Sequence, residues 1–372
     1  MSTLKVDGIR SNSATSDAIT LADNGTCTAN ITNNLSNRNL IINGAFQVAQ
    51  RGTSSTSTGY QTVDRINPYH GGTDEAPTYA QADVASGTTP YTSGFRKCFK
   101  ITNGNQTSGA GAGDQIAFRY IIEAQDIANS GWNYLSSSSF ITLSFWIKSS
   151  VAQAFSGSLE TKDGTSYFFK YDTPSLSADT WTKVTKTISG NSNLQFNNDN
   201  GSGLAFNLYG FIGTTYTTSN SDTETWVTGS DKFANNMTST WYTTNDSTLE
   251  ITGVQLEVGS VATDFEHRSF HDELSKCMRY CQVINPRATG WIVSATQVRF
   301  SVDWVTQMRA NPTCTLGGAF VQYGPGGQQT GTLQGFDAIS VNGCIPILNT
   351  GGGMTTNAPA TGGITMTASA EL

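Results

Sequence analysis

Short segments in which apolar and polar residues alternate recur along this chain, and they restrict its fold more than any other feature. Residues 180–188 are the clearest example of this period of two. The pattern predicts a β-strand, because successive side chains of a strand point to opposite faces of the sheet. Further segments of the same kind are 95–101, 115–121, 140–148, 203–211 and 249–257.

The stretches between these segments are irregular in length and rich in turn-forming residues, which is typical of a two-sheet β-sandwich. No strand–helix–strand alternation is present, which disfavours an α/β fold. Charged residues make up only 13% of the chain, against roughly 25% in ordinary soluble domains. Aromatic residues reach 10%, too many for a disordered chain. We therefore expect an all-β protein whose surface is kept soluble by hydroxyl and amide groups.

The segments divide the chain into four parts. Residues 1–36 contain strand fragments too short to form a core alone, so we expect an oligomerisation module in which copies of the chain intertwine. A loose terminal arm is the alternative. Residues 37–268 form the predicted sandwich, 269–285 a connecting helix, and 286–372 a small C-terminal β domain.

The predicted helix has a continuous apolar face. Its residues recur at the helical spacing i, i+3, i+4 and i+7, with acidic residues at the start and basic residues near the end. The face consists of Leu274, Cys277, Met278 and Cys281.

Charge and hydropathy exclude several classes of partner. The net charge is −7 and no run of basic residues occurs, so we expect no nucleic-acid partner and no binding to an anionic membrane surface. No apolar stretch is long enough to insert into a membrane, and the first residues do not resemble a secretory signal. A chain made in a reducing cytoplasm should keep its cysteines as free thiols; these are Cys27, Cys98, Cys277, Cys281, Cys314 and Cys344.

Candidate catalytic residues are scarce. The chain has three histidines, and none lies in a motif typical of an activated nucleophile. A pair of carboxylates for glycan hydrolysis is the remaining enzymatic alternative, but the sequence contains no β-helix repeat of the kind found in many glycan-cutting proteins. We expect a protein that is not an enzyme, with no catalytic residues and no cofactor.

One group of residues has the composition of a zinc site. His267, His271, Cys277 and Cys281 lie on or beside the predicted helix, and zinc accepts such ligands. The two cysteines also belong to the apolar face, where a buried cysteine acts as a small hydrophobic residue. Because of this second role, we predict no metal site.

Carbohydrate binding is the chemistry that the aromatic residues favour. A sugar offers an apolar face to an aromatic ring and hydroxyl groups to amides and carboxylates. The long polar stretch 214–247 contains rings of this kind, and long loops are often functional. The candidate glycan contacts are Tyr216, Trp226, Trp241 and Tyr242, with Tyr69 and His70 as weaker candidates. Alternatively, these rings pack on the edge of the sandwich or against a neighbouring subunit.

Several blocks of sequence together resemble those of bacteriophage tail-fibre proteins. Asn39-Leu40-Ile41-Ile42-Asn43-Gly44-Ala45-Phe46, followed by Gln50-Arg51-Gly52 and Asp64-Arg65, is similar to the opening of phage tail-fibre and tail-collar proteins. Residues 145–150 and 181–184 resemble galactose-binding-like jelly rolls related to carbohydrate-binding modules. Residues 249–259 and 263–269 are similar to the closing strand and joint of such phage domains. The segments 5–9 and 18–21 look like those of marine phage fibres.

The resemblance covers most of residues 1–285 and is less distinct over 286–372. It implies a jelly-roll sandwich in a structural component of a virion, exposed on the particle exterior, in most relatives a homotrimer. The implied partners are copies of itself, other virion proteins through the N-terminal module, and a host cell-surface glycan. A head fibre, a decoration protein or a tail adaptor with a purely structural role is the alternative. No sugar-binding motif can be carried over residue by residue.

Overall fold

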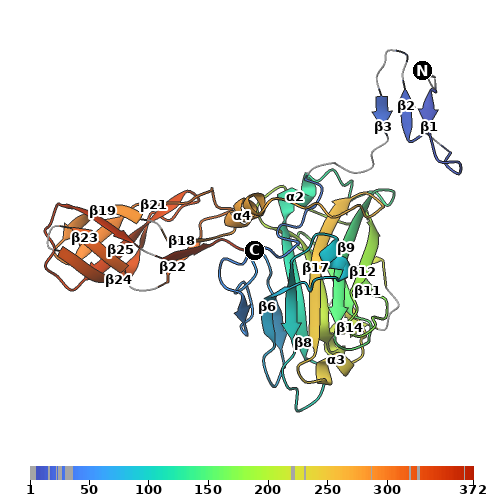
Figure 1. Ribbon diagram of the computed structural model, residues 1–372, viewed down its shortest axis with the longest axis horizontal. Helices are drawn as coiled ribbons and strands as arrows, with labels where there is room; N and C mark the ends of the chain where they lie inside the picture. The colour runs from blue at the N-terminus through green and yellow to red at the C-terminus, as the bar shows by residue number, and fades with distance from the viewer. Residues whose placement is uncertain are drawn as a thin grey trace.

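The computed structural model describes residues 6–15, 17–21, 23, 27–29, 37–218, 223–229, 232–285, 287–317, 320–324, 327–363 and 365–372. The described elements are almost entirely strands, which confirms the all-β prediction. Figure 1 shows a large sandwich and a C-terminal module that projects from it. A separate small sheet near the N-terminus consists of β1 (Gly8–Ile9), β2 (Ile19–Leu21) and β3 (Cys27–Ala29).

Two six-stranded antiparallel sheets form the sandwich. The first, called here the β8 sheet, has the order β15 (Trp226–Thr228), β11 (Tyr167–Asp172), β10 (Ser156–Thr161), β13 (Ser202–Ile212), β8 (Gln115–Glu123) and β5 (Tyr69–Gly71). The second, the β9 sheet, has the order β12 (Thr182–Ser189), β9 (Phe140–Ser149), β17 (Thr248–Val258), β7 (Lys97–Thr102), β6 (Thr78–Asp83) and β4 (Ser54–Ser55).

Short elements cover the ends and one face of the sandwich. The helices are α1 (Thr89–Thr92), α2 (Ala124–Ala128), α3 (Thr240–Thr243) and the 3-10 turn η1 (Thr214–Tyr216). β14 (Thr217–Thr218) and β16 (Ala234–Asn235) pair in parallel. Within the described ranges, no helix has the length and apolar character needed to cross a bilayer.

All six segments predicted from their alternating pattern are strands of the sandwich, namely β7, β8, β9, β12, β13 and β17. Their inward-facing side chains make one apolar core that is rich in aromatic rings. Phe118 lies at its centre, with ring centroids 5.5 Å from Phe99, 6.0 Å from Phe46 and 5.5 Å from Phe206. Edge-on and tilted contacts of this kind stabilise a core beyond simple burial.

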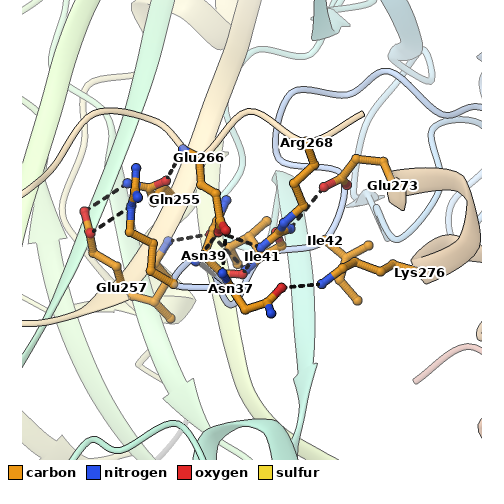
Figure 2. A network of polar contacts seen from close by, with 12 residues as sticks. Asn37, Asn39, Ile41, Ile42, Gln255, Glu257, Glu266, Arg268, Glu273 and Lys276 are labelled. Atoms are coloured by element: carbon orange, nitrogen blue, oxygen red, sulfur yellow. Dashed lines mark hydrogen bonds and ion pairs between the residues drawn. The ribbon is translucent and has the colours of Figure 1, made fainter. Parts of the chain in front are cut away.

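A buried polar network fixes the start of the sandwich to its end (Figure 2). Arg268 donates to the carbonyl oxygen of Asn39 at 2.7 Å and forms ion pairs with Glu266 at 2.8 Å and Glu273 at 3.0 Å. The amide side chain of Asn39 donates to the carbonyl oxygen of Val254. The residues that resemble a tail-fibre opening therefore lock the first segment onto the closing strand β17, which is a structural role.

The connecting helix is shorter than predicted. α4 (Phe270–Met278) begins at Ser269, whose hydroxyl accepts a hydrogen bond from the backbone N–H of Asp272. The helix was expected to continue to Cys281, but Cys281 starts strand β18 (Cys281–Ile284) instead. The physical reason is that β18 pairs with β27 (Met366–Ser369), so its backbone groups are satisfied across a sheet.

The C-terminal module, residues 281–372, has two parts. β18, β27 and β22 (Thr313–Leu316) form a three-stranded neck. Beyond the neck lies a barrel of β20 (Gln297–Phe300), β19 (Arg287–Ser294), β26 (Pro359–Gly363), β23 (Phe320–Gly324), β24 (Gly327–Asp337) and β25 (Gly343–Thr350), with β21 (Val302–Asp303) added to β25. The pairing of β20 with β25 closes the circle of strands.

A buried arginine joins the sandwich to the C-terminal module. Arg65 is fully buried, forms an ion pair with Glu371, and has its guanidinium 3.5 Å from the ring centroid of Tyr280. Arg51 forms a second ion pair with Glu371 at 3.2 Å. The hydroxyl of Tyr60 donates to the carbonyl oxygen of Leu372 at 2.9 Å. The last residues of the chain are therefore part of this junction.

Candidate functional site

A groove of about 500 Å³ lies on the outer face of the β9 sheet. Strand β9 forms part of its floor, because Phe145 and its alternate neighbours face the core while Ser144 and Trp146 face outward. Trp146 is half-buried, so part of its indole is accessible from the groove. Lys183 of the edge strand β12 lies at one side and is exposed.

A β-bulge in strand β17 shapes the floor. The register of β17 against β9 shifts between Thr252 and Gln255, and Gly253 within the bulge has a φ of +64°. A Cβ atom on Gly253 would lie 2.6 Å from the ring of Phe95. Only glycine combines this backbone conformation with so close an approach of an aromatic ring.

Three rings form one wall of the groove. Phe95 and Phe265 have centroids 4.9 Å apart, and His267 lies 5.0 Å from the first and 4.9 Å from the second. The Nε2 atom of His267 is 2.9 Å from the carbonyl oxygen of Ser93, which ties the 263–267 segment to the segment after α1. The ring contacts and this hydrogen bond hold the wall against the sandwich.

The remaining lining is polar and includes hydroxyl groups of Thr92, Ser144 and Thr263 together with the exposed carboxylate of Asp264. The groove thus combines an accessible indole with hydrogen-bonding groups of both kinds. Such a set can hold a ligand that has one flat apolar face and several hydroxyls. Among the described residues that line it, Asp264 is the single carboxylate.

The structure places three of the predicted glycan contacts inside the sandwich. Trp241 and Tyr242 are fully buried; Trp241 Nε1 donates to the carbonyl oxygen of Thr248 at 3.0 Å, and the hydroxyl of Tyr242 donates to Asp114 at 3.0 Å. Trp226 is 9% exposed and its Nε1 donates to the carbonyl oxygen of Ser189. Their ring faces are not available to a ligand, because these rings close the end and edge of the sandwich.

The other three predicted contacts lie apart from the groove. Tyr216 is half-buried and stacks on Phe233, with centroids 5.6 Å apart. Tyr69 packs in the same cluster on the outer face of the β8 sheet, and burial raises its pKa. His70 faces the other way, with its Nδ1 3.1 Å from the hydroxyl of Tyr79, and burial lowers its pKa. Tyr69 and Tyr216 both pack against the cluster of Ala117, Tyr209, Ile212 and Ala234.

The group with a zinc-like composition is not assembled into a site. His267 faces Ser93, as described above. Cys277 and Cys281 are buried, and burial raises the pKa of the Cys281 thiol to about 12 and that of Cys277 well above its usual value. In the part of the chain that the structure describes, no group of three His, Cys, Asp or Glu side chains could hold a metal ion.

Sequence reasoning missed the groove because it favoured aromatic residues in the long polar stretch. The available signal was Trp146, an aromatic residue at an outward position of a strand whose alternate residues are apolar. Phe95 and Phe265 gave no such signal, since their contact depends on the bulge at Gly253 and not on sequence spacing.

Comparison with known proteins gives fold-level similarity only. No family model matches the chain, and no curated protein matches it. A solved structure of the enzymatically active domain of bacteriophage CBA120 tailspike protein 4 is 10% identical, with 59% of this chain and 21% of that chain covered and a TM-score of 0.31. The chain therefore spans about a fifth of that tailspike structure.

Carbohydrate-binding modules are also among the similar structures. The family 11 module from Clostridium thermocellum, in complex with a mixed-linked tetrasaccharide, is 10% identical, with 57% and 98% coverage and a TM-score of 0.27. The tandem CBM22 domains of Paenibacillus barcinonensis Xyn10C are 8% identical, with 91% and 100% coverage and a TM-score of 0.26. Scores this low carry no functional conclusion for this chain.

Proposed function

We propose that this chain is a non-enzymatic adhesion subunit on the exterior of a bacteriophage virion, whose sandwich binds a host-surface glycan in the groove of the β9 sheet. The observation that carries the proposal is the accessible indole of Trp146 among hydroxyl and charged groups. A sugar ring stacks on such an indole while its hydroxyls bond to the surrounding polar groups.

The position of the groove suits binding more than catalysis. Trp146 and Ser144 lie on β9, which has a hydrogen-bonded strand on each side and holds them more precisely than a loop would. Hydrolysis of a glycosidic bond normally requires two carboxylates about 5–10 Å apart. The described lining supplies Asp264 alone, which supports a role in binding.

Two features support a place in a virion assembly. The first is the resemblance of residues 39–46, 50–52 and 64–65 to tail-fibre openings. The second is the small N-terminal sheet, where Ile9 of β1 and Leu21 of β2 are exposed, as is Val6 just before β1. Apolar side chains on so small a sheet gain stability when they pack against other chains, and we propose a homotrimer.

The test of glycan binding compares two tryptophans on the same outer face. Trp146→Ala removes the ring that lines the groove, whereas Trp181→Ala removes another half-buried ring that lies outside the lining. Binding of the purified full-length variants to a glycan array and to host cells is measured, with circular dichroism as a folding control. Loss of binding in Trp146→Ala alone supports the proposal; equal binding by wild type and Trp146→Ala refutes the assignment of the groove.

A second candidate function is assembly alone, as a head fibre, decoration protein or tail adaptor. The exposed apolar residues of the N-terminal sheet favour it, because they suit a protein partner better than a glycan. Labelling of virions with an antibody against the sandwich and adsorption tests on virions that lack the protein separate the two. Normal adsorption without the protein would favour assembly. Sedimentation of the full-length chain in the analytical ultracentrifuge tests the proposed homotrimer, because it gives the mass of the assembly in solution.

A further inference from the structure

Two cysteines of the C-terminal module meet in its core. Cys314 lies on β22, the edge strand of the neck, and Cys344 lies on the barrel strand β25 (Figure 1). Cys344 is buried and belongs to the core of the module, whereas Cys314 is half-buried and packs against that core. Strands of two different sheets therefore each bring a thiol to the same part of the molecule.

The two thiols are in direct contact beside Met366 of β27. Cys314 lies opposite Ala368 in the register of β22 and β27, and Met366 lies two residues before Ala368 on the same face of β27. The Sγ atom of Cys344 is 3.9 Å from the Sδ atom of Met366. The thiols of Cys344 and Cys314 are also hydrogen-bonded to each other. Sulfur atoms that already touch need little backbone movement to form a bond.

The surroundings of this pair differ from those of the buried cysteines in the rest of the chain. The hydrogen bond from Cys344 lowers the pKa of the Cys314 thiol, and the same bond raises the pKa of Cys344 well above its usual value. Burial instead raises the pKa of Cys98 and of Cys281 to about 12. Because the thiolate is the nucleophile in disulfide exchange, Cys314 is the cysteine poised to react, and Cys344 lies beside it as the second thiol.

We propose that Cys314 and Cys344 form a disulfide bond in an oxidising medium, with a low-molecular-weight disulfide such as glutathione disulfide as the oxidant. The Cys314 thiolate attacks one sulfur of the oxidant, forms a mixed disulfide and releases one glutathione. The Cys344 sulfur then attacks the Cys314 sulfur and releases the second glutathione. The two protons lost by the cysteines end on the two glutathione thiols. This inference goes beyond glycan binding, and only the oxidising surroundings rest on the proposed exterior location.

The disulfide joins the neck to the barrel covalently. Among the described strands, β22 pairs with β27 alone, whereas β25 pairs with β20, β21 and β24. The bond therefore links a strand held on one side to a strand held on both sides, and it closes a loop that contains β23 and β24. A cross-link of this kind stabilises the fold by restricting the unfolded chain.

The test uses the full-length protein, purified in reduced form and then incubated with glutathione disulfide. The remaining thiols are alkylated with iodoacetamide after unfolding, and mass spectrometry of proteolytic peptides assigns the state of all six cysteines. We expect a linked pair of peptides that contain Cys314 and Cys344, and an alkylated Cys98.

Hydrogen exchange measures the effect of the bond on the module. Amides of β22 and β25 should exchange about tenfold or more slowly in the oxidised protein than in the reduced protein. Cys314→Ser and Cys344→Ser should abolish this difference. Cys98→Ala, which removes a buried thiol of the sandwich, should keep both the linked peptides and the slower exchange. The comparison of oxidised and reduced wild type needs no substitution, so it holds even if a variant does not fold.

Three results would overturn the proposal. One is that Cys314 and Cys344 both stay free in excess glutathione disulfide. Another is a reaction that stops at a mixed disulfide of Cys314 with glutathione, or that pairs either residue with a different cysteine. A linked pair with unchanged exchange in β22 and β25 would refute the stabilising role of the bond. Glycan binding is measured separately with Trp146→Ala, so failure of the disulfide and failure of the proposed function are distinguishable.

Discussion

The sandwich and the C-terminal barrel use aromatic residues in opposite ways. The core of the sandwich contains a connected set of rings around Phe118, and Trp132, Trp226 and Trp241 are buried with it. Among the described residues, the buried core of the C-terminal module contains two aromatic side chains, Phe300 and Trp304, and otherwise aliphatic residues, methionines and a cysteine. The tryptophan at the centre of a barrel strand, Trp291, faces solvent.

The difference follows from the space that each architecture encloses. Two stacked sheets lie about 10 Å apart, and large rings fill that gap well. A small closed barrel has a narrow interior that alanine, valine and leucine fill. A ring on a barrel strand can therefore be accommodated outside more easily than inside. An exposed aromatic residue on the barrel is thus more informative about binding than a buried one in the sandwich.

The strongest test of this comparison replaces one ring in each region. Phe118→Ala should lower the free energy of unfolding by about 4 kcal/mol, since it removes contacts with three rings and leaves a cavity. Trp291→Ala should lower it by about 2 kcal/mol or less, because half of that indole is already in water. Urea unfolding followed by circular dichroism measures both. Equal losses would mean that the two regions do not differ in this respect.

The next largest effect is expected at the junction between the two regions. Arg65→Met should cost about 3 kcal/mol, because it leaves Glu371 with Arg51 alone in a buried position. Lys97→Met, which breaks an ion pair with the exposed Asp83, should cost less than about 1 kcal/mol. Thermal unfolding gives the stabilities, and limited proteolysis shows whether the module separates from the sandwich. Proteolytic patterns that are identical in both variants would contradict a role for Arg65 in docking.

The same junction should make stability depend on pH. Burial raises the pKa of Asp64 to about 6, while the groups facing it include Gln50, Arg51 and Glu371, with Cys277 and Cys281 nearby. The carboxyl group of Asp64 therefore stays protonated up to about pH 6 in the folded state, but only up to about pH 4 in the unfolded state. Asp64 therefore adds about 2 to 3 kcal/mol to the free energy of unfolding below about pH 4. This contribution is lost as the pH rises through 6.

Asp64→Asn isolates this contribution. The difference in unfolding free energy between wild type and variant, measured by urea titration from pH 4 to pH 7, should change across that window and be constant above it. The amide cannot titrate, while one oxygen remains to accept from the backbone N–H of Gln50. A difference that does not vary with pH would show that Asp64 is ionised in the folded state throughout.

The smallest effect is expected in the helix that links the regions. Ser269→Ala removes the side chain that caps α4, and should cost about 1 kcal/mol. Ser269→Asp should retain most of the stability, because a carboxylate also caps a helix. Thermal melts compare the three proteins. If Ser269→Ala melts at the same temperature as wild type, packing between the regions, and not the cap, positions the helix.

The sequence predicts the sandwich well where one face of a strand is polar. β12 and β9 show the alternation plainly, and the structure confirms both as strands, which pair antiparallel with each other. β10 and β11 were not predicted, because Ser156–Thr161 is buried on both faces and contains serine and glycine in place of an apolar alternation. The closure of the barrel also escaped prediction, since it depends on the pairing of β20 with β25, which local sequence does not specify.

The site was harder to predict than the fold. The stretch 214–247 looks like an open loop in sequence, but its helix α3 inserts Trp241 and Tyr242 into the end of the sandwich. The indole N–H of Trp241 and the hydroxyl of Tyr242 donate to buried acceptors on Thr248 and Asp114. No sequence pattern predicts these pairs. The alternation of β9 indicates that Trp146 faces outward, but the groove beside it is visible only in the structure. Trp291 could be placed only when strand register showed which face of β19 it occupies.

The three-stranded neck has a mechanical consequence. The chain leaves the sandwich along β18 and returns along β27, and β22 pairs with β27 as well, so the barrel is attached by several hydrogen-bonded strands (Figure 1). A pull on the barrel along the neck loads these strands in shear, and many hydrogen bonds must then break together. A single tether would instead lengthen under the same force. A barrel anchored in this way could transmit tension to the sandwich without the two parts separating.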